Sequence, residues 1–278
     1  MNMNEKKTEK VISFYNNFNE QDRLSNNLGQ IEFIRTQSII QRYLKTKSAV
    51  VLDIGGAAGR YACWLAQEGH IVHLVDPVPK HIDQAKIASG EQTETPIASI
   101  QVGDARHLDF ADEIADAVLL LGPLYHLVDY KDRFQALSEV LRVLKPGGLL
   151  FAACITRFAS MTDGLISGRS LDPSFQKIIR RDLSDGQHRN PNDDPSFFTD
   201  SFFHHPDELR ADVGNAGFEV KDLLAVEGLS FLMKDLKETW KIESQRQFLL
   251  KIIEKTEREP SLMGASPHII CVGVKPGE

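Results

Sequence analysis

The chain has 278 residues, of which 42% are hydrophobic and 26% charged, so it is long enough to bury a full core. Its formal net charge is −7 and no basic stripe is present, which argues against a nucleic acid partner. The sequence has no apolar run of membrane-spanning length and no signal-peptide pattern, and we therefore expect a cytoplasmic protein.

Residues 1–48 have the amphipathic spacing of helices and are expected to form an N-terminal helical cap. Residues 49–155 alternate between apolar runs and helical patterns. Strands are predicted at 49–55, 71–76, 97–104, 115–122 and 148–155, with helices at 59–70, 79–89 and 130–144. Because each strand is a continuous apolar run, both its faces should be buried. This predicts a doubly wound α/β fold, with a mostly parallel sheet and helices on both faces.

Residues 156–205 interrupt this alternation and are too long for an ordinary connection, so a lid-like insertion on the substrate side is expected after the fifth strand. Its aromatic residues suggest either an apolar pocket or the interior of the lid; they are Phe158, Phe175, Phe197, Phe198, Phe202 and Phe203. Residues 206–278 return to the same α/β core, with a helix ending at Gly217, a strand at 220–228, one long helix at 235–256 and a last strand at 268–276.

The cysteines and histidines do not have the spacing of a metal site. Cys63, Cys154 and Cys271 lie far apart in apolar segments and lack the C-x-x-C pattern, so buried thiols in a reducing cytoplasm are expected. The segments HRNPNDD (188–194) and FFHHP (202–206) contain candidate ligands, but without a defined ligand spacing no metal site is predicted.

The stretch DIGGAAG, residues 53–59, joins the first predicted strand to its helix. A dinucleotide fold requires G-x-G-x-x-G, and neither Gly55 nor Gly56 begins such a pattern; the G-K-[ST] of a phosphate loop is also absent. Asp53 would repel a diphosphate and better suits a ligand that carries an ammonium group. The alternative is a plain strand-to-helix turn.

Two further acids end the next two predicted strands. Asp76 is placed to accept hydrogen bonds from the ribose hydroxyls of an adenosine, and Asp104 to take the exocyclic amine of adenine beside the backbone of Ala105. The alternatives are a strand-end cap at Asp76 and a turn aspartate at Asp104. The carboxyl ends of parallel strands meet at the edge where open α/β sheets bind ligands, so the three acids predict an adenosine site there.

Five consecutive segments resemble the motifs of class I S-adenosylmethionine-dependent methyltransferases of the small-molecule type. They are VLDIGGAAGRYACWLA, LVDPVPKHIDQA, IQVGDARHLDF, ADAVLLLGPLYHL and EVLRVLKPGGLLFAA. The resemblance covers residues 30–155 and resumes at AGFEV and HIICVGVKP. It implies a seven-stranded sheet whose last strand is antiparallel, and S-adenosylmethionine as the cofactor.

The resemblance also implies the residues that contact the cofactor, which are Asp53, Gly55, Gly56, Ala57, Gly59, Asp76, Pro77, Asp104, Ala105 and Leu121. Asp53 is expected near the cofactor's ammonium group, Asp76 at its ribose, and Asp104 with Ala105 around its adenine. The family's glycine motif is acid-x-Gly-x-Gly-x-Gly, and Ala57 stands where its middle glycine would be. The position then needs a φ that an alanine can adopt.

The segment GPLYHL (122–127) follows the fourth predicted strand and is expected under the transferred methyl group. Tyr125 and His126 are its candidate catalytic residues: His126 either orients or deprotonates a nucleophile, or both side chains only shape the pocket. The asparagine-proline-proline-aromatic signature of enzymes that methylate nucleic acid amines is absent here. With the acidic net charge, this favours a small-molecule acceptor.

Three side chains outside the motifs are candidate cofactor contacts. Tyr15 could close the site from the N-terminal cap, and Arg35 or Arg60 could meet the cofactor carboxylate. The predicted function is methyl transfer from S-adenosylmethionine to a small molecule, driven by positioning and exclusion of water. The alternatives are a nicotinamide-dependent oxidoreductase and a non-catalytic protein that binds S-adenosylmethionine. The sequence leaves the acceptor and the oligomeric state open.

Overall fold

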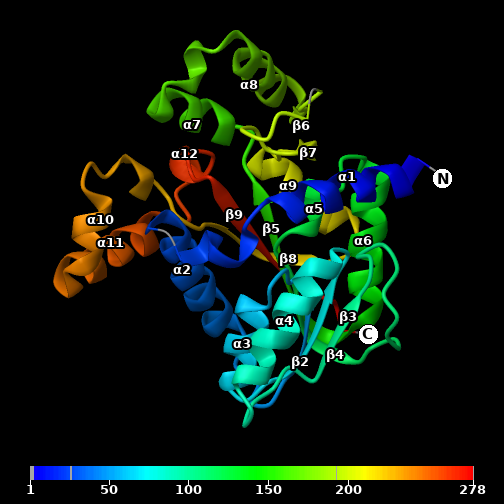
Figure 1. The fold of residues 1–278 in the computed structure, drawn as a ribbon. Coiled ribbons are helices and arrows are strands. Elements are labelled where there is room, and N and C mark those ends of the chain that lie inside the picture. Colours follow the sequence, from blue (N-terminus) through cyan, green and yellow to red (C-terminus); the bar gives the residue numbers. More distant parts are fainter. Residues whose placement is uncertain (1–2, 26, 192, 278) are drawn as a thin grey trace.

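The computed structural model describes residues 3–25, 27–191 and 193–277, which form an α/β fold around one twisted sheet (Figure 1). The sheet has seven strands in the order β3 (Ser99–Val102), β2 (Ile71–Asp76), β1 (Val50–Ile54), β4 (Ala115–Leu120), β5 (Leu144–Ile155), β9 (His268–Val274) and β8 (Glu219–Ala225). β9 runs antiparallel to both its neighbours, and the first five strands pair in parallel. The predicted sheet, with its antiparallel last strand, is confirmed.

Helices cover both faces of the sheet, and a separate hydrophobic cluster fills each interface. One face packs on α2 (Asn27–Tyr43), α3 (Arg60–Gln67) and α4 (Pro79–Glu91). The other packs on the short α5 (Pro123–His126), α6 (Tyr130–Val143), α9 (Pro206–Asn215) and α12 (Pro260–Met263). The strands carry apolar residues on both faces because neither face meets water, which is the pattern that identified them in the sequence.

The N-terminal cap consists of α1 (Met3–Asn17) and the 3-10 helix η1 (Glu20–Ser25), followed by α2. In Figure 1, α1 crosses above the carboxyl edge of the sheet, next to α5. The insertion forms a lobe beyond the same edge, with α7 (Ala159–Ser167), η2 (Arg169–Leu171), α8 (Pro173–Asp185) and a two-stranded ribbon of β6 (Gln187–His188) and β7 (Ser201–Phe202). Both segments therefore lie over the edge where the predicted ligand site is located.

Two of the insertion's six phenylalanines form the lobe's own interior. Phe175 and Phe197 are buried together with Ile178 in a small separate core. Phe198 differs, because its ring lies 5.6 Å from the His126 ring and 5.4 Å from that of Phe14 in α1. Of the two alternatives for these aromatics, the structure supports a lid interior, with Phe198 as the contact to the cap.

The prediction of one long helix at 235–256 is wrong. The segment contains two helices, α10 (Leu236–Lys241) and α11 (Glu243–Thr256), separated by Ile242 in an extended conformation. The break allows side chains of both helices to pack on α2 around the buried Ile31; they are Leu236, Trp240, Leu249 and Ile253. Tertiary packing thus overrides the continuous helical pattern. Within the described ranges, no helix has the length and apolarity needed to cross a bilayer.

Candidate active site

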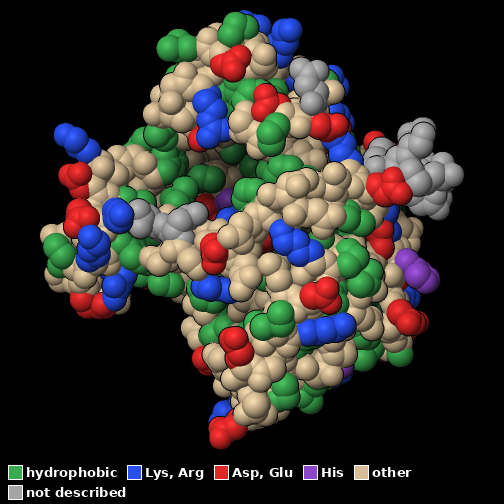
Figure 2. Space-filling model, viewed as in Figure 1, with side chains coloured by type: hydrophobic (Ala, Val, Ile, Leu, Met, Phe, Trp, Pro, Cys, Tyr) green, Lys and Arg blue, Asp and Glu red, His purple; other side chains and the backbone are tan. Residues whose placement is uncertain are grey.

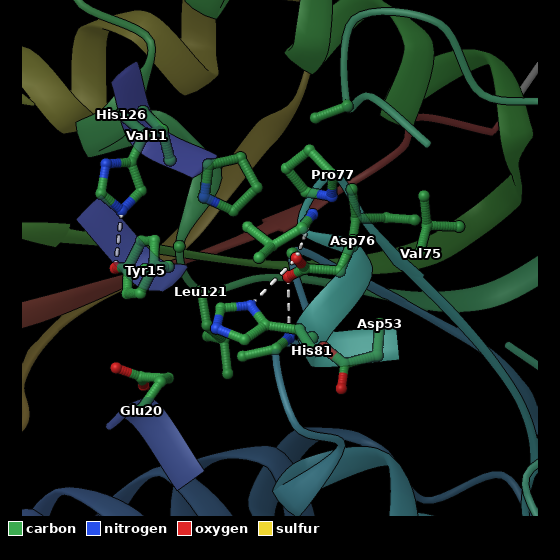
Figure 3. Close-up of a pocket in the computed structure, with 18 of the residues that line it drawn as sticks. Val11, Tyr15, Glu20, Asp53, Val75, Asp76, Pro77, His81, Leu121 and His126 are labelled. Atoms are coloured by element: carbon green, nitrogen blue, oxygen red, sulfur yellow. Dashed lines mark hydrogen bonds and ion pairs between the residues drawn. The ribbon is translucent and has the colours of Figure 1, made fainter. Parts of the chain in front are cut away.

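A cavity lies at the carboxyl edge of β1, β2 and β4, beneath α1, and contains about 1260 Å³ of empty space including its open mouth. The predicted site residues that line it are Tyr15, Asp53, Gly55, Gly56, Ala57, Asp76, Pro77, Asp104, Ala105, Leu121, Tyr125 and His126. Figure 3 shows several of them around one space: Tyr15 from α1, Asp53 and Asp76 from the ends of β1 and β2, and His126 from α5. Gly59 and Arg35, which were also predicted, do not line it.

The glycines of the loop after β1 are required by close approaches of the backbone. A Cβ on Gly55, whose φ is +73°, would lie 2.7 Å from the Pro123 ring. A Cβ on Gly56 would lie 2.7 Å from a carboxylate oxygen of Asp53, so this glycine makes room for the acid. Gly59 has a φ of +82° and precedes the first turn of α3; a Cβ on it would lie 3.2 Å from the Ala85 Cβ.

Ala57 adopts a left-handed backbone conformation, with a φ of +47°. A residue with a Cβ pays about 1 kcal/mol for this region, whereas a glycine enters it freely. The predicted requirement, a φ accessible to alanine, is therefore met only at an energetic cost. In this conformation the Ala57 N–H donates a hydrogen bond to an Asp76 oxygen at the end of β2, at 2.9 Å.

Asp53 supplies a buried carboxylate with one oxygen that is free to accept a hydrogen bond from a ligand. Its side chain is 1% exposed, and Oδ2 has no hydrogen-bond partner among the described residues. Burial, and then the charge of Asp76, raise the pKa of Asp53 to about 7. A buried carboxylate oxygen without a partner is costly, so the site favours a ligand that brings a positive hydrogen-bond donor to it.

Asp76 is held in a fixed orientation by three donors. Oδ2 accepts from the Ala57 N–H, while Oδ1 accepts from the Val78 N–H at 2.9 Å and faces Nδ1 of His81 at 3.1 Å. A carboxylate has about four acceptor positions, so roughly one remains for a ligand hydroxyl. Nε2 of His81 is buried and has no hydrogen-bond partner among the described residues.

Sequence reasoning did not identify His81, although it lies five residues after Asp76, at the start of the next helix. Figure 3 shows its ring between Asp76 and the space bounded by Tyr15 and Glu20. Asp76 and His81 together offer hydrogen-bonding atoms to two neighbouring hydroxyls, a task that the sequence pattern assigned to Asp76 alone.

Asp104 lines the far end of the cavity and is bound to Arg106. Its two oxygens accept from Nε and Nη2 of Arg106 at 2.9 and 2.5 Å. Burial opposes ionisation of Asp104, but the hydrogen bonds from Arg106 outweigh it and hold the pKa of the carboxyl below its usual value. The position at the cavity is as predicted, and its contact with an adenine amine stays a prediction.

His126 is half-buried, and its ring is held against the cap. Its Nε2 lies 2.9 Å from the Tyr15 hydroxyl, and burial, with a smaller effect of His81, lowers the pKa of His126 to about 3. A group this weakly basic is poorly suited to take a proton near neutral pH. Burial also raises the pKa of Tyr125. For both residues these shifts favour the alternative in which they shape the cavity.

The end of α1 is fastened to α4, which keeps the cap over the cavity. The Lys80 ammonium donates to the backbone oxygens of Tyr15, Asn16 and Phe18 at 3.1–3.2 Å. A cation at a helix C-terminus satisfies unpaired carbonyls and interacts favourably with the helix dipole. Together with the contact between Tyr15 and His126, this closes one side of the site.

The assignment of Arg35 to the cofactor carboxylate is wrong. Arg35 is 2% exposed, and its guanidinium forms an ion pair with Glu257. Arg42 pairs with the same carboxylate. Arg35 and Arg42 are seven residues apart and therefore share a helix face, which packs on the C-terminal segment instead of the cavity. Arg60 does line the cavity, where its guanidinium lies over the Phe33 ring.

Arg23 of η1 lines the cavity and was not identified from the sequence. It donates through Nε to Glu20 at 2.6 Å and through Nη1 to Glu32 at 2.5 Å, and both acids also line the cavity. Residues three apart lie on one side of a 3-10 helix, so the spacing of Glu20 and Arg23 was a signal for this pair.

A second charged group, also missed from the sequence, adjoins Glu32. Glu227 follows β8, His268 begins β9, and the ligand-type atoms of Glu32, Glu227 and His268 lie within 4.8 Å of one another. Each carboxylate already accepts hydrogen bonds, Glu32 from Arg23 and Glu227 from His268 and Ser266. We therefore describe this group as an ion-pair network.

Comparison with known proteins finds methyltransferases over part of the chain. Residues 52–152 match the family described as a methyltransferase domain. Methyltransferase GfsG of Streptomyces halstedii is 29% identical over 129 residues, which is 46% of this chain and 45% of that protein. A demethylmenaquinone methyltransferase of Lactiplantibacillus plantarum is 33% identical over 138 residues, 46% of this chain and 55% of its own. The chain thus spans about half the length of the curated relatives it matches.

Solved structures share the fold over most of the chain. A SAM-dependent methyltransferase from Methanosarcina mazei has a TM-score of 0.59 at 20% identity, covering 86% of this chain and 98% of its own. The cyclase SpnF has a TM-score of 0.55 at 16% identity, covering 89% and 82%. The second name is that of a cyclase, so the shared fold alone does not set the reaction.

Proposed function

We propose that this chain, whose residues 52–152 belong to the methyltransferase domain family and whose fold is that of class I S-adenosylmethionine-dependent methyltransferases, transfers a methyl group to a small molecule. The observation that carries the proposal is the unpartnered oxygen of Asp53 in a cavity that also presents Asp76 and Asp104. This spacing of acids along three neighbouring strand ends suits an adenosine with a positively charged tail and no phosphates.

The residues present fit S-adenosylmethionine from end to end. We assign Asp53 to the ammonium group, Asp76 with His81 to the two ribose hydroxyls, and Asp104 with Ala105 to the adenine. Of the arginines that line the cavity, we assign Arg60 to its carboxylate in place of Arg35, because Arg23 is already paired with Glu20 and Glu32. When bound, S-adenosylmethionine supplies a methyl group activated by a positive sulfur. The protein's own contribution is to orient the reactants and exclude water, which α1 and Tyr15 support by covering the cavity.

The proposal includes a small-molecule acceptor and a cytoplasmic location. The cavity lies beneath the cap and the insertion, which favours a compact acceptor over a macromolecule. The cysteines Cys63, Cys154 and Cys271 are all free thiols, two of them buried, as is usual for a protein in a reducing compartment.

Calorimetry on the full chain tests the proposal. S-adenosylhomocysteine should bind with measurable heat, and the nicotinamide dinucleotide should not bind at the same concentration. Absence of heat with S-adenosylhomocysteine, or tighter binding of the nicotinamide dinucleotide, would refute the methyltransferase assignment in favour of the oxidoreductase alternative. Methyl transfer from labelled S-adenosylmethionine to a metabolite extract then separates an enzyme from a protein that only binds the cofactor.

A further inference from the structure

His268 and Glu227 lie at the carboxyl edge of the sheet because β9 is antiparallel to its neighbours β5 and β8. The first residue of β9, His268, pairs with Ile155 at the end of β5, and Glu227 comes two residues after the end of β8. Both are therefore at the same edge as Asp53 and Asp76. In the strand order they lie on the β5–β9–β8 side, whereas the acids assigned to the adenosine end β1, β2 and follow β3. This leaves the pair on the side available to a second ligand.

Glu227 holds the His268 ring in one orientation. Nδ1 of the His268 ring lies 2.5 Å from one oxygen of Glu227. The other oxygen accepts hydrogen bonds from the backbone N–H of His268 at 3.0 Å and from the Ser266 hydroxyl at 3.1 Å. The carboxylate is 1% exposed, whereas the His268 side chain is 22% exposed. Since Nδ1 is committed to Glu227, the ring's remaining polar atom for a ligand is Nε2.

The molecular surface is hollowed near the start of β9. Figure 2 shows a hollow between the α7–α8 lobe and the α10–α11 segment, which flank the start of β9 in Figure 1. Hydrophobic side chains surround the hollow in Figure 2. Both flanking segments carry exposed hydrophobic residues, namely Leu165 and Ile166 of α7 and Leu229, Leu232 and Met233 around η3 (Ser230–Leu232).

The charges around His268 keep it protonated. The groups that face it are Glu227, Glu32 of α2 and Arg23 of η1. Burial lowers the pKa of His268, but the charges of Glu227 and Glu32 outweigh this and raise it to about 9. At neutral pH the ring is therefore an imidazolium, and Nε2 is a charged hydrogen-bond donor. Glu32 is itself paired with Arg23, so it does not occupy Nε2.

We propose that Nε2 of His268 binds the methyl acceptor and that this acceptor presents an oxyanion, a phenolate, enolate or carboxylate. The inference rests on the proposed function and adds the substrate class. The acceptor oxygen attacks the methyl carbon, so the O–C bond forms while the C–S bond breaks. The C–S electron pair stays on sulfur as a neutral thioether, and no proton has to move.

An oxyanion suits this environment better than an amine. The imidazolium and the positive sulfur of the cofactor both attract an anion, and His268 donates a hydrogen bond to it. A protonated amine is repelled by both charges and has no free electron pair for the attack. The apolar residues around the hollow suit the carbon body of such an acceptor.

Binding of 4-nitrophenol, whose anion absorbs visible light, tests the inference on the full chain saturated with S-adenosylhomocysteine. We expect binding with appearance of the phenolate band at a pH where the free probe is still protonated. His268→Gln should weaken this binding at least tenfold. His107→Gln, a change at an exposed histidine, is the matched control and should have no effect. Absence of binding, equal binding by His268→Gln, or preferential binding of benzylamine would overturn the oxyanion assignment.

The pH dependence separates a direct role of His268 from a structural one. The wild-type affinity for the phenolate should fall as the pH rises through about 9, where the imidazolium loses its proton. In Glu227→Gln the same fall should occur at lower pH, because the charge that raises the His268 pKa is gone. An affinity change that is equal at every pH would contradict the proposal. Calorimetry with S-adenosylhomocysteine on the same samples distinguishes this failure from failure of the proposed function, which would abolish cofactor binding.

Discussion

Replacement of Asp76 by alanine tests the placement of the cofactor most directly. The side chain is 4% exposed, and its oxygens receive the Ala57 and Val78 N–H groups and face His81. The substitution removes the acceptor for a ribose hydroxyl and frees the ring of His81. Losing one buried hydrogen bond and leaving its partner unsatisfied costs about 1–3 kcal/mol, which corresponds to a roughly 5- to 150-fold weaker affinity.

The assay is calorimetric titration of S-adenosylhomocysteine into the full chain at neutral pH. Asp83→Ala, a change at an exposed aspartate of the neighbouring helix α4, is the matched control and should bind as the wild type does. Circular dichroism confirms that the Asp76→Ala variant is folded before its affinity is compared. A folded Asp76→Ala variant with unchanged affinity would refute the placement of the ribose at β2 and, with it, the assignment of His81.

Three further predictions concern the same region. Ala57→Gly should raise the free energy of unfolding by up to about 1 kcal/mol in urea denaturation, because glycine adopts the φ of +47° without strain; a loss of stability would contradict this. Asp53→Asn should stabilise the protein at pH 8 by up to about 4 kcal/mol and much less at pH 4, while weakening S-adenosylhomocysteine binding. The folded-state pKa of about 7 lies above the unfolded value of 3.8. Ionisation of Asp53 therefore costs stability as the pH rises from 3.8 to about 7, and the full cost is present above that range. Arg35→Ala should reduce the free energy of unfolding by roughly 1.5–3 kcal/mol without changing cofactor affinity, because the buried Glu257 loses one of its arginine partners and keeps Arg42 and Arg258; weakened binding in a folded variant would restore Arg35 to the site.

The part of the site proposed to bind adenosine could be predicted from the sequence because it depends on local order along the chain. Each of Asp53, Asp76 and Asp104 lies at or just beyond the end of a strand that its own apolar run identifies. Parallel pairing then brings these ends to one edge. The glycines of the first loop follow the same logic, since a tight turn from strand to helix demands them within a few residues.

The cap and the C-terminal part could not be placed in this way. Arg35 and Arg23 are both arginines of the N-terminal helices, and only the packing of α2 on the C-terminal segment decides that Arg35 faces Glu257 while Arg23 faces the cavity. The break between α10 and α11 has the same origin, because both helices adjust to one buried side chain of α2.

The sequence by itself determined the α/β alternation, the parallel core and the position of the three strand-end acids of the proposed adenosine site, because the hydrophobic period and the residues at strand ends are local properties. Tertiary structure decided which charged side chains complete the site. Arg23, Glu32, Glu227 and His268 come from the cap, from α2 and from the last two strands, and they meet because β9 enters the sheet at the edge where the other strands end. It also decided that His126 is a neutral partner of Tyr15, because burial by α1 removes its charge.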